Sequence, residues 1–213
     1  MPQPFLIMGA TSGIGKCSVD EALLRNLPVR AFARSADKLS PKANLEVAAG
    51  DALNPDDVAT ALQGVRAVIF ALGIKERLSM LWQEETLFSE TTRILLDQME
   101  IAGVSRLIVV TGFGAGRSRA AMSTPERIGH KAIFGKPYAD KSRQEALILD
   151  SRTDWTIVRP TILTNSKKTG QYRVLRDPSE WRMGMISRSD VATYLIDAAT
   201  DDIDVKIDVV LTR

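Results

Sequence analysis

Three glycines with the spacing G-x-x-x-G-x-G stand at positions 9, 13 and 15, inside the stretch GATSGIG. An apolar run, Phe5 to Met8, precedes them. A stretch with helical spacing follows, and the candidates for its apolar face are Ile14, Val19, Leu23 and Leu24. Strand, glycine loop and helix together place a pyrophosphate on free backbone N–H groups at a helix N-terminus. In that geometry Gly9 allows the tight turn, Gly13 lets the phosphates approach, and Gly15 lets the helix pack against the strand. The spacing differs from the ordinary G-x-G-x-x-G fingerprint, and glycines also mark simple turns.

A basic residue, Arg34, follows a second candidate strand over Val29 to Ala33. In dinucleotide-binding folds this strand end faces the adenosine ribose, where a basic side chain accepts a 2′-phosphate. Arg34, with Ser35 beside it, therefore favours NADPH over NADH; the alternative is an ordinary exposed arginine. Asp51, after a weak third strand, either reaches the adenine edge or serves as a turn residue.

Residues 112–136 are rich in glycine and in basic side chains, and Glu126 is their only acidic residue. We expect an irregular substrate loop here, because long loops at strand ends commonly carry binding residues. Its positive charge would attract planar acceptors that carry phosphate or carboxylate groups, and the alternative is a solvated loop. The only histidine, His130, lies inside this segment without a carboxylate neighbour, which is more typical of a surface or packed residue.

Strands and helices must alternate to position these residues. Apolar runs predict strands over residues 5–8, 29–33, 45–48, 67–72, 106–111, 155–160 and 205–211, with a short additional strand over 172–175. Helical patterns follow the glycine loop and recur over residues 55–62, 87–102, 137–149 and 189–199, the last capped by Ser189. This alternation predicts an α/β fold with a parallel sheet, right-handed crossovers and helices on both faces.

The composition fits one domain over residues 1–213 with a near-neutral net charge of +2. Near-neutrality gives no case for nucleic acid or an anionic membrane as a partner. The single Cys17 excludes an internal disulfide, and no Cys/His cluster suggests a metal. No signal peptide pattern and no apolar run long enough to cross a bilayer is present, so we expect a cytoplasmic protein.

Nearly the whole chain resembles the atypical short-chain dehydrogenases/reductases, of the branch containing biliverdin-IXβ reductase/flavin reductase and NmrA-like relatives. The matching pieces are GATSGIG at 9–15, AR at 33–34, GD at 50–51, ALG at 71–73, SETTRILLDQM at 89–99, VVTG at 109–112, DWTIVRP at 154–160, TGQYRV at 169–174 and ISRSDV at 186–191. The order and spacing of these pieces carry the resemblance.

The resemblance implies a Rossmann-like doubly wound sheet of order 3-2-1-4-5-6 with an extra C-terminal strand, and NADPH (NADP+) as cofactor. By position, the residues implied to bind the cofactor are Gly9, Thr11, Ser12, Gly13, Ile14, Arg34, Ser35, Asp51, Ala52, Leu72, Gly73, Thr111, Lys141 and Pro160. Thr111, Lys141 and Pro160 would surround the nicotinamide ribose and ring. Pigment-reducing members carry a serine and a histidine where this chain has Gly112 and Ile162.

Thr111, Tyr138 and Lys141 are the candidate catalytic residues. The Tyr-x-x-x-Lys dyad of ordinary short-chain dehydrogenases is absent, because Ser142 stands four residues after Tyr138. Tyr138 and Lys141, three residues apart on a helix, can still share a face. The alternatives are a packed or exposed Tyr138, and a Lys141 that forms an i,i+4 pair with Glu145.

A small NADPH-dependent reductase is the function this pattern favours. Its small-molecule substrate would be a planar, electron-poor acceptor such as a flavin, quinone or tetrapyrrole, which takes a hydride without a dedicated acid. A non-catalytic NADP(H)-sensing regulator of the NmrA-like type is the alternative, since Gly112 and Ile162 supply no reactive side chain. A third hypothesis is an isomerase or dehydratase that retains its nicotinamide.

Overall fold

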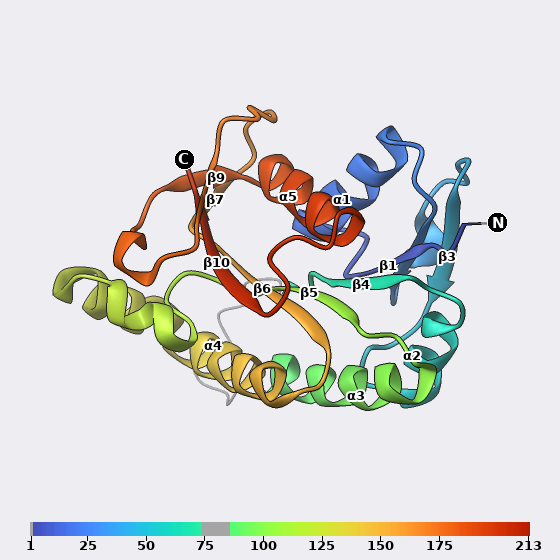
Figure 1. The fold of residues 1–213 in the computed structure, drawn as a ribbon, viewed down its shortest axis with the longest axis horizontal. Helices are drawn as coiled ribbons and strands as arrows, with labels where there is room; N and C mark the ends of the chain where they lie inside the picture. The colour runs from blue at the N-terminus through green and yellow to red at the C-terminus, as the bar shows by residue number, and fades with distance from the viewer. Residues whose placement is uncertain (1, 74–85) are drawn as a thin grey trace.

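The main sheet of this protein is twisted and lies between two layers of helices (Figure 1). The computed structural model describes residues 2–73 and 86–213, without the side chains of residues 126–136. Within these ranges, eight strands form one sheet in the order β3-β2-β1-β4-β5-β6-β10-β8. In that order the strands are Leu45–Ala49, Val29–Ala33, Phe5–Met8, Ala67–Phe70, Arg106–Val110, Asp154–Pro160, Ile207–Thr212 and Arg173–Leu175.

Every neighbouring pair in the sheet is parallel except β10 with β8. The predicted order 3-2-1-4-5-6 with an extra C-terminal strand is therefore confirmed. Parallel pairing brings the carboxyl ends of β1, β4, β5 and β6 to one edge of the sheet, where open α/β sheets bind their ligands. We call this the carboxyl edge.

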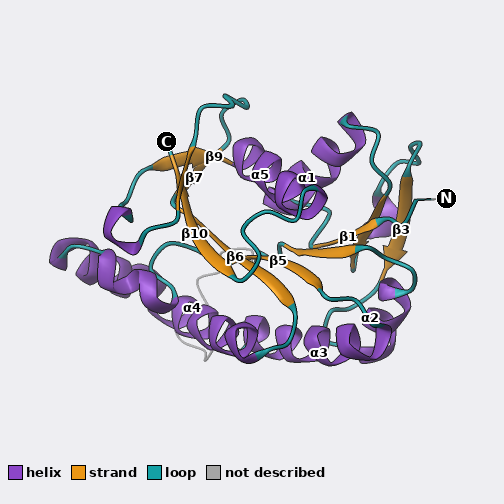
Figure 2. Cartoon of the chain, viewed as in Figure 1, coloured by secondary structure: helices purple, strands orange, loops and turns teal. Residues whose placement is uncertain are grey.

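Helices cover both faces, as Figure 2 shows. On one face lie α1 (Gly13–Leu24) and α5 (Arg188–Thr200); on the other lie α2 (Pro55–Leu62), α3 (Leu87–Ala102) and α4 (Thr124–Asp150). Short 3-10 turns are η1 (Ala36–Lys38), η3 (Gly116–Ala121) and η4 (Pro178–Glu180). The doubly wound α/β class expected from the alternating pattern is confirmed.

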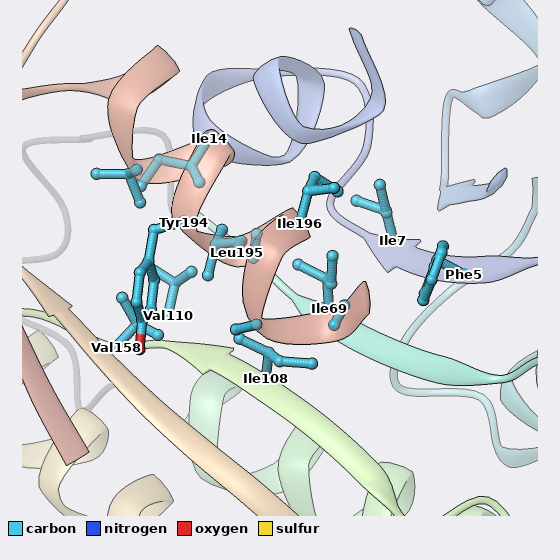
Figure 3. Packing of buried hydrophobic residues seen from close by; sticks show 14 of the residues in the cluster. Phe5, Ile7, Ile14, Ile69, Ile108, Val110, Val158, Tyr194, Leu195 and Ile196 are labelled. Carbon is cyan, nitrogen blue, oxygen red and sulfur yellow. The ribbon is translucent and has the colours of Figure 1, made fainter. Parts of the chain in front are cut away.

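Side-chain alternation along the strands divides the core in two. Phe5 and Ile7 of β1 pack toward α1 and α5, whereas Leu6 and Met8 pack toward α2 and α3. Figure 3 shows strand side chains meeting Leu195 and its neighbours on α5. Fully burying one such aliphatic side chain contributes about 1.5–3 kcal/mol, so both helical layers are held to the sheet mainly by apolar burial.

Three details differ from the sequence-based expectations. Leu24, expected on the apolar face of α1, is 75% exposed, because the helix ends there. The N-cap of α5 is Ser187 rather than Ser189, and its hydroxyl accepts the Asp190 N–H. Part of the polar stretch after Pro160 forms β7 (Ile162–Thr164), which pairs with β9 (Met185–Ser187) in a separate two-stranded sheet.

The expectation of irregular structure over residues 112–136 is wrong for its second half. Helix α4 begins at Thr124 and continues through the glycines and through Pro137. Pro125 lies in the first turn, where its missing N–H costs no hydrogen bond. The sequence contains this helix-start signal, but the many glycines of the segment favoured a loop. The segment between β5 and the helix is residues 111–123, including η3.

A buried arginine joins α4 to the two strands beneath it. Arg159 of β6 is fully buried and donates to both carboxylate oxygens of Glu145 on α4, at 2.9 and 2.7 Å. Its other amino group donates to Asp208 of β10 at 2.5 Å. Burial pushes the pKa of Asp208 up, but the bonds and charges of Arg117 and Arg159 bring it below its usual range. We call Glu145, Arg159 and Asp208 the buried ion cluster.

Replacing Arg159 with Met should lower the free energy of unfolding by ~3–5 kcal/mol, because two buried carboxylates would lose their partner. Urea denaturation at pH 7 measures this loss. Lys16→Met is the matched control, since Lys16 and Asp20 form an exposed pair worth only ~0.3–0.5 kcal/mol. An Arg159→Met protein as stable as wild type would contradict the role given to the cluster.

Candidate functional site

The glycine loop after β1 is packed too tightly for side chains at two of its glycines. Gly9 has a φ of 81°, and a Cβ there would lie 2.6 Å from the Ala71 carbonyl oxygen. A Cβ on Gly15 would overlap the carbonyl oxygen of Gly9. The first turn of α1 therefore sits directly against the ends of β1 and β4, as the sequence-based roles of these glycines require.

The N-terminus of α1 is left open. Ser12 occupies the N-cap position, but its side chain makes no capping hydrogen bond. Among the described residues, none accepts a hydrogen bond from the backbone N–H of Ser12, Gly13 or Ile14. Gly13, with a φ of 55°, faces open space where a side chain would stand. Unpaired donors at a helix N-terminus, next to free volume, fit the pyrophosphate of a dinucleotide.

The end of β2 lies beside this loop. Ser35 Oγ is 3.3 Å from Thr11 Oγ1 and donates to it, which joins the two segments. Arg34 is exposed and has no ion-pair or hydrogen-bond partner within the described part of the chain. A free guanidinium beside a phosphate-binding loop is available to a second anion, such as a 2′-phosphate.

The segment after β3 uses its polar groups locally. Asp51 accepts the Leu53 N–H at 3.0 Å, and its own N–H donates to the Asp57 carboxylate at 2.8 Å. Ala52 is buried in the core. These bonds favour the turn interpretation of Asp51 over the adenine interpretation. Across the loop, Leu72 is half-buried and Gly73 exposed at the end of β4.

Thr111, Lys141 and Pro160 come together at the carboxyl edge. Thr111 is buried; its hydroxyl donates to Glu145 at 2.6 Å, and its carbonyl accepts the Lys141 ammonium. The carbonyl of Pro160, at the end of β6, accepts the Phe113 N–H at 3.1 Å. Because the Thr111 hydroxyl already donates its hydrogen bond to Glu145, its oxygen can only accept a hydrogen bond from a bound molecule.

Lys141 lies among aromatic rings rather than beside a carboxylate. Its ammonium is 4.9 Å from the centroid of Phe88 and 5.6 Å from that of Tyr138. Burial, partly opposed by the charge of Glu145, lowers the pKa of Lys141 to about 8. The expected alternative, an i,i+4 pair of Lys141 with Glu145, is not what forms: Glu145 bonds Arg159 and Thr111 instead.

The basic segment is less free than its composition indicates. Arg117, one of the basic residues of segment 112–136, forms an ion pair with Asp208 of β10. Its guanidinium also lies 5.0 Å from the centroid of the Trp181 ring. Arg119 is exposed and has no ion pair among the described residues. His130 and three of the expected basic side chains lie outside the described side chains.

Sequence reasoning missed the residues that support this site. Arg159 and Asp208 look like ordinary strand residues, and only the register of β6 with β10 brings them together. Asp140 of α4 is buried and accepts the Phe88 N–H at the start of α3, at 2.7 Å. One usable signal is a charged residue inside an apolar strand run, as in DWTIVRP and IDVVL, because a buried charge requires a partner.

Two kinds of feature were searched for within the described ranges. No group of three or more His, Cys, Asp or Glu residues there is placed to hold a metal ion. No helix there has the length and apolar content needed to cross a membrane.

The NAD(P)H-binding family matches residues 9–202, so the chain belongs to that family. Its fold is that of the atypical short-chain dehydrogenases/reductases, and NAD(P)H is the cofactor of the family. The glycine loop described above lies at the beginning of the matched region.

Solved structures share the fold over almost the whole chain. ChuY, an anaerobilin reductase from Escherichia coli O157:H7, is 27% identical with a TM-score of 0.81, over 99% of this chain and 97% of that one. A short-chain dehydrogenase/reductase from Veillonella parvula in complex with NADP gives a TM-score of 0.81 at 17% identity, over 100% and 95% of the chains. An uncharacterized chloroplastic protein of Arabidopsis thaliana is 27% identical, over 90% of this chain and 70% of that protein.

Arg34→Ala should weaken NADPH binding by ~10- to 100-fold and leave NADH binding almost unchanged, because only NADPH offers a 2′-phosphate to the guanidinium. Titration of cofactor fluorescence measures both affinities. Arg152→Ala, which removes a 95% exposed arginine beside β6, is the control and should change neither. Equal losses of NADPH and NADH affinity in Arg34→Ala would contradict the assignment.

Proposed function

We propose that this protein is an NADPH-dependent reductase that delivers a hydride to a planar, electron-poor acceptor of the flavin, quinone or tetrapyrrole type. One observation carries the proposal: the open N-terminus of α1 and the Thr111–Lys141–Pro160 group lie on the same carboxyl edge. A dinucleotide that spans this edge would have its phosphates at one end and its nicotinamide at the other.

The chain's own residues fit such a cofactor. The N–H groups of Ser12, Gly13 and Ile14 would hold the pyrophosphate, and Arg34 the 2′-phosphate. Lys141 Nζ would donate to the hydroxyls of the nicotinamide ribose. When bound, the nicotinamide supplies the hydride, and the protein orients its reactive face.

Two exposed apolar side chains support a planar acceptor. Ile162 and Met185 are register partners in the parallel pair β7–β9 and are 54% and 60% exposed. Register partners point to the same face of a sheet, so these two side chains form one small apolar surface. This apolar surface begins two residues after Pro160, at the edge where the nicotinamide would lie. A flat aromatic molecule can cover it and exclude water from the reacting atoms.

The likeness to ChuY supports the tetrapyrrole type among these acceptors, because that protein is described as an anaerobilin reductase. A specific observation favours the alternative, an NADP(H)-sensing protein without catalysis. Residue 112 is glycine and residue 162 is isoleucine, so neither supplies a side chain that reacts.

A cofactor-consumption assay distinguishes the reductase from the NADP(H)-sensing protein. We expect NADPH oxidation, followed at 340 nm, when menadione, dichlorophenolindophenol, FMN or biliverdin is added to the purified protein. Arg34→Ala should raise KM for NADPH by ~10- to 100-fold with every acceptor, which excludes a contaminating reductase. Tight NADPH binding without oxidation by any of the four acceptors would contradict the reductase and support the sensor.

A further inference from the structure

Residues 165–171 form an exposed strap that runs from the end of β7 toward β8 (Figure 1). The strap leaves β7 after Thr164, the register partner of Ser187, which caps the N-terminus of α5. Strand β7 continues the chain past the carboxyl end of β6. The strap therefore begins at the carboxyl edge, where the first turn of α1 also lies.

Two carboxylates hold this strap against the helices of the same face. Lys168 donates to both carboxylate oxygens of Glu21 on α1, at 2.8 and 3.0 Å. The buried Asp190 of α5 accepts the backbone N–H groups of Thr169 and Gly170 at 2.9 and 2.8 Å. The strap is thus fixed to both α1 and α5, although all of its side chains are exposed.

The contact with Glu21 lies on the face of α1 that leads to the phosphate-binding turn. Glu21 comes about two turns after Ile14, so the two residues share one face of the helix, ~11 Å apart along its axis. The backbone N–H of Ile14 is one of the unpaired donors of the first turn. Since the strap comes from the carboxyl edge, Lys167 precedes Lys168 on the way from that edge to Glu21.

The first turn of α1 has little positive charge of its own for a pyrophosphate. A helix N-terminus is equivalent to about half an elementary charge, whereas the pyrophosphate of a dinucleotide carries about two negative charges. Lys16, the only basic residue of α1, is paired with Asp20 at 2.5 Å. Lys167, by contrast, is exposed and forms no ion pair with any residue that the structure describes.

We propose that Lys167 is a further cofactor-binding residue, whose ammonium group pairs with the pyrophosphate, and that the Lys168–Glu21 ion pair positions it. The proposal rests on the proposed function for the place of the cofactor, but not for hydride transfer to an acceptor. A lysine suits this role because its charge ends a flexible four-carbon chain and requires no fixed geometry. Lys168 is a positioning residue, because Glu21 already pairs with its charge.

Affinities for three ligands test the role of Lys167. Lys167→Met should raise the Kd of NADPH and the Kd of NADH alike by ~10-fold, because both molecules contain the pyrophosphate. The Kd of 2′-AMP, which has the 2′-phosphate but no pyrophosphate, should stay within ~2-fold. Cofactor fluorescence gives the first two constants, and competition against NADPH gives the third. Lys206→Met, which removes an exposed lysine just before β10 at the opposite edge of the sheet, is the matched control and should change none of them.

A double-mutant cycle tests the positioning role of Lys168. Lys168→Met releases the strap from α1, so it should weaken binding of both dinucleotides and leave 2′-AMP binding unchanged. Adding Lys167→Met to this variant should then cost less than ~3-fold, because a lysine on a released strap has little left to lose. Thermal unfolding of each variant separates this coupling from a loss of folded protein.

Chemical labelling of the wild-type protein adds a readout that needs no variant. Sulfo-NHS-acetate acetylates exposed amines, and peptide mass spectrometry reports each lysine separately. NADP+ at ten times its Kd should slow the acetylation of Lys167 by ~10-fold, because only the small unliganded fraction then reacts. Lys206 should keep its rate, and 2′-AMP should protect neither lysine.

The possible failures differ from one another. The proposal is overturned if Lys167→Met binds NADPH and NADH as wild type does, if NADP+ leaves the acetylation of Lys167 unchanged, or if the losses of the two variants multiply. A loss for NADPH that does not extend to NADH would assign Lys167 to the 2′-phosphate and also overturn it. If NADPH binds but no acceptor oxidises it, the reductase function fails, whereas the three binding results still decide the role of Lys167.

Discussion

The buried ion cluster is the interaction on which the site depends. Arg159 has no access to water, and both of its carboxylate partners belong to other elements, α4 and β10. A guanidinium in that position must keep its partners, because an unpaired buried charge costs several kcal/mol. The pairing therefore fixes α4 against the sheet at Glu145. One turn earlier along the same helix, Lys141 is brought to the carbonyl of Thr111.

The other half of the site depends on groups left without protein partners. The first turn of α1 has unbonded N–H groups, and Arg34 has no carboxylate beside it, within the part of the chain that the structure describes. By contrast, Asn54 caps the N-terminus of α2 and Ser187 caps the N-terminus of α5. This chain belongs to the NAD(P)H-binding family, so the unbonded N–H groups at the N-terminus of α1 are best explained by a ligand that accepts their hydrogen bonds.

A feature could be predicted from the sequence when the residues that form it are close together in the chain or belong to a family pattern. The glycine loop, the strand order and the position of Arg34 depend on residues close in sequence or on a family pattern, and the sequence was sufficient for them. The pair of Arg117 with Asp208 joins residues 91 positions apart, and periodicity carries no information about such a contact. The place of the Tyr138 hydroxyl likewise depends on an absent side chain at residue 112, which no motif records.

A crystal structure of the NADP+ complex tests the central claim most directly, because it locates both ends of the cofactor at once. The pyrophosphate should accept hydrogen bonds from the N–H groups of Ser12, Gly13 and Ile14, with the 2′-phosphate against Arg34. The nicotinamide should lie at Thr111, Lys141 and Pro160. A dinucleotide bound away from the first turn of α1, or with its nicotinamide directed away from the end of β5, would contradict this assignment.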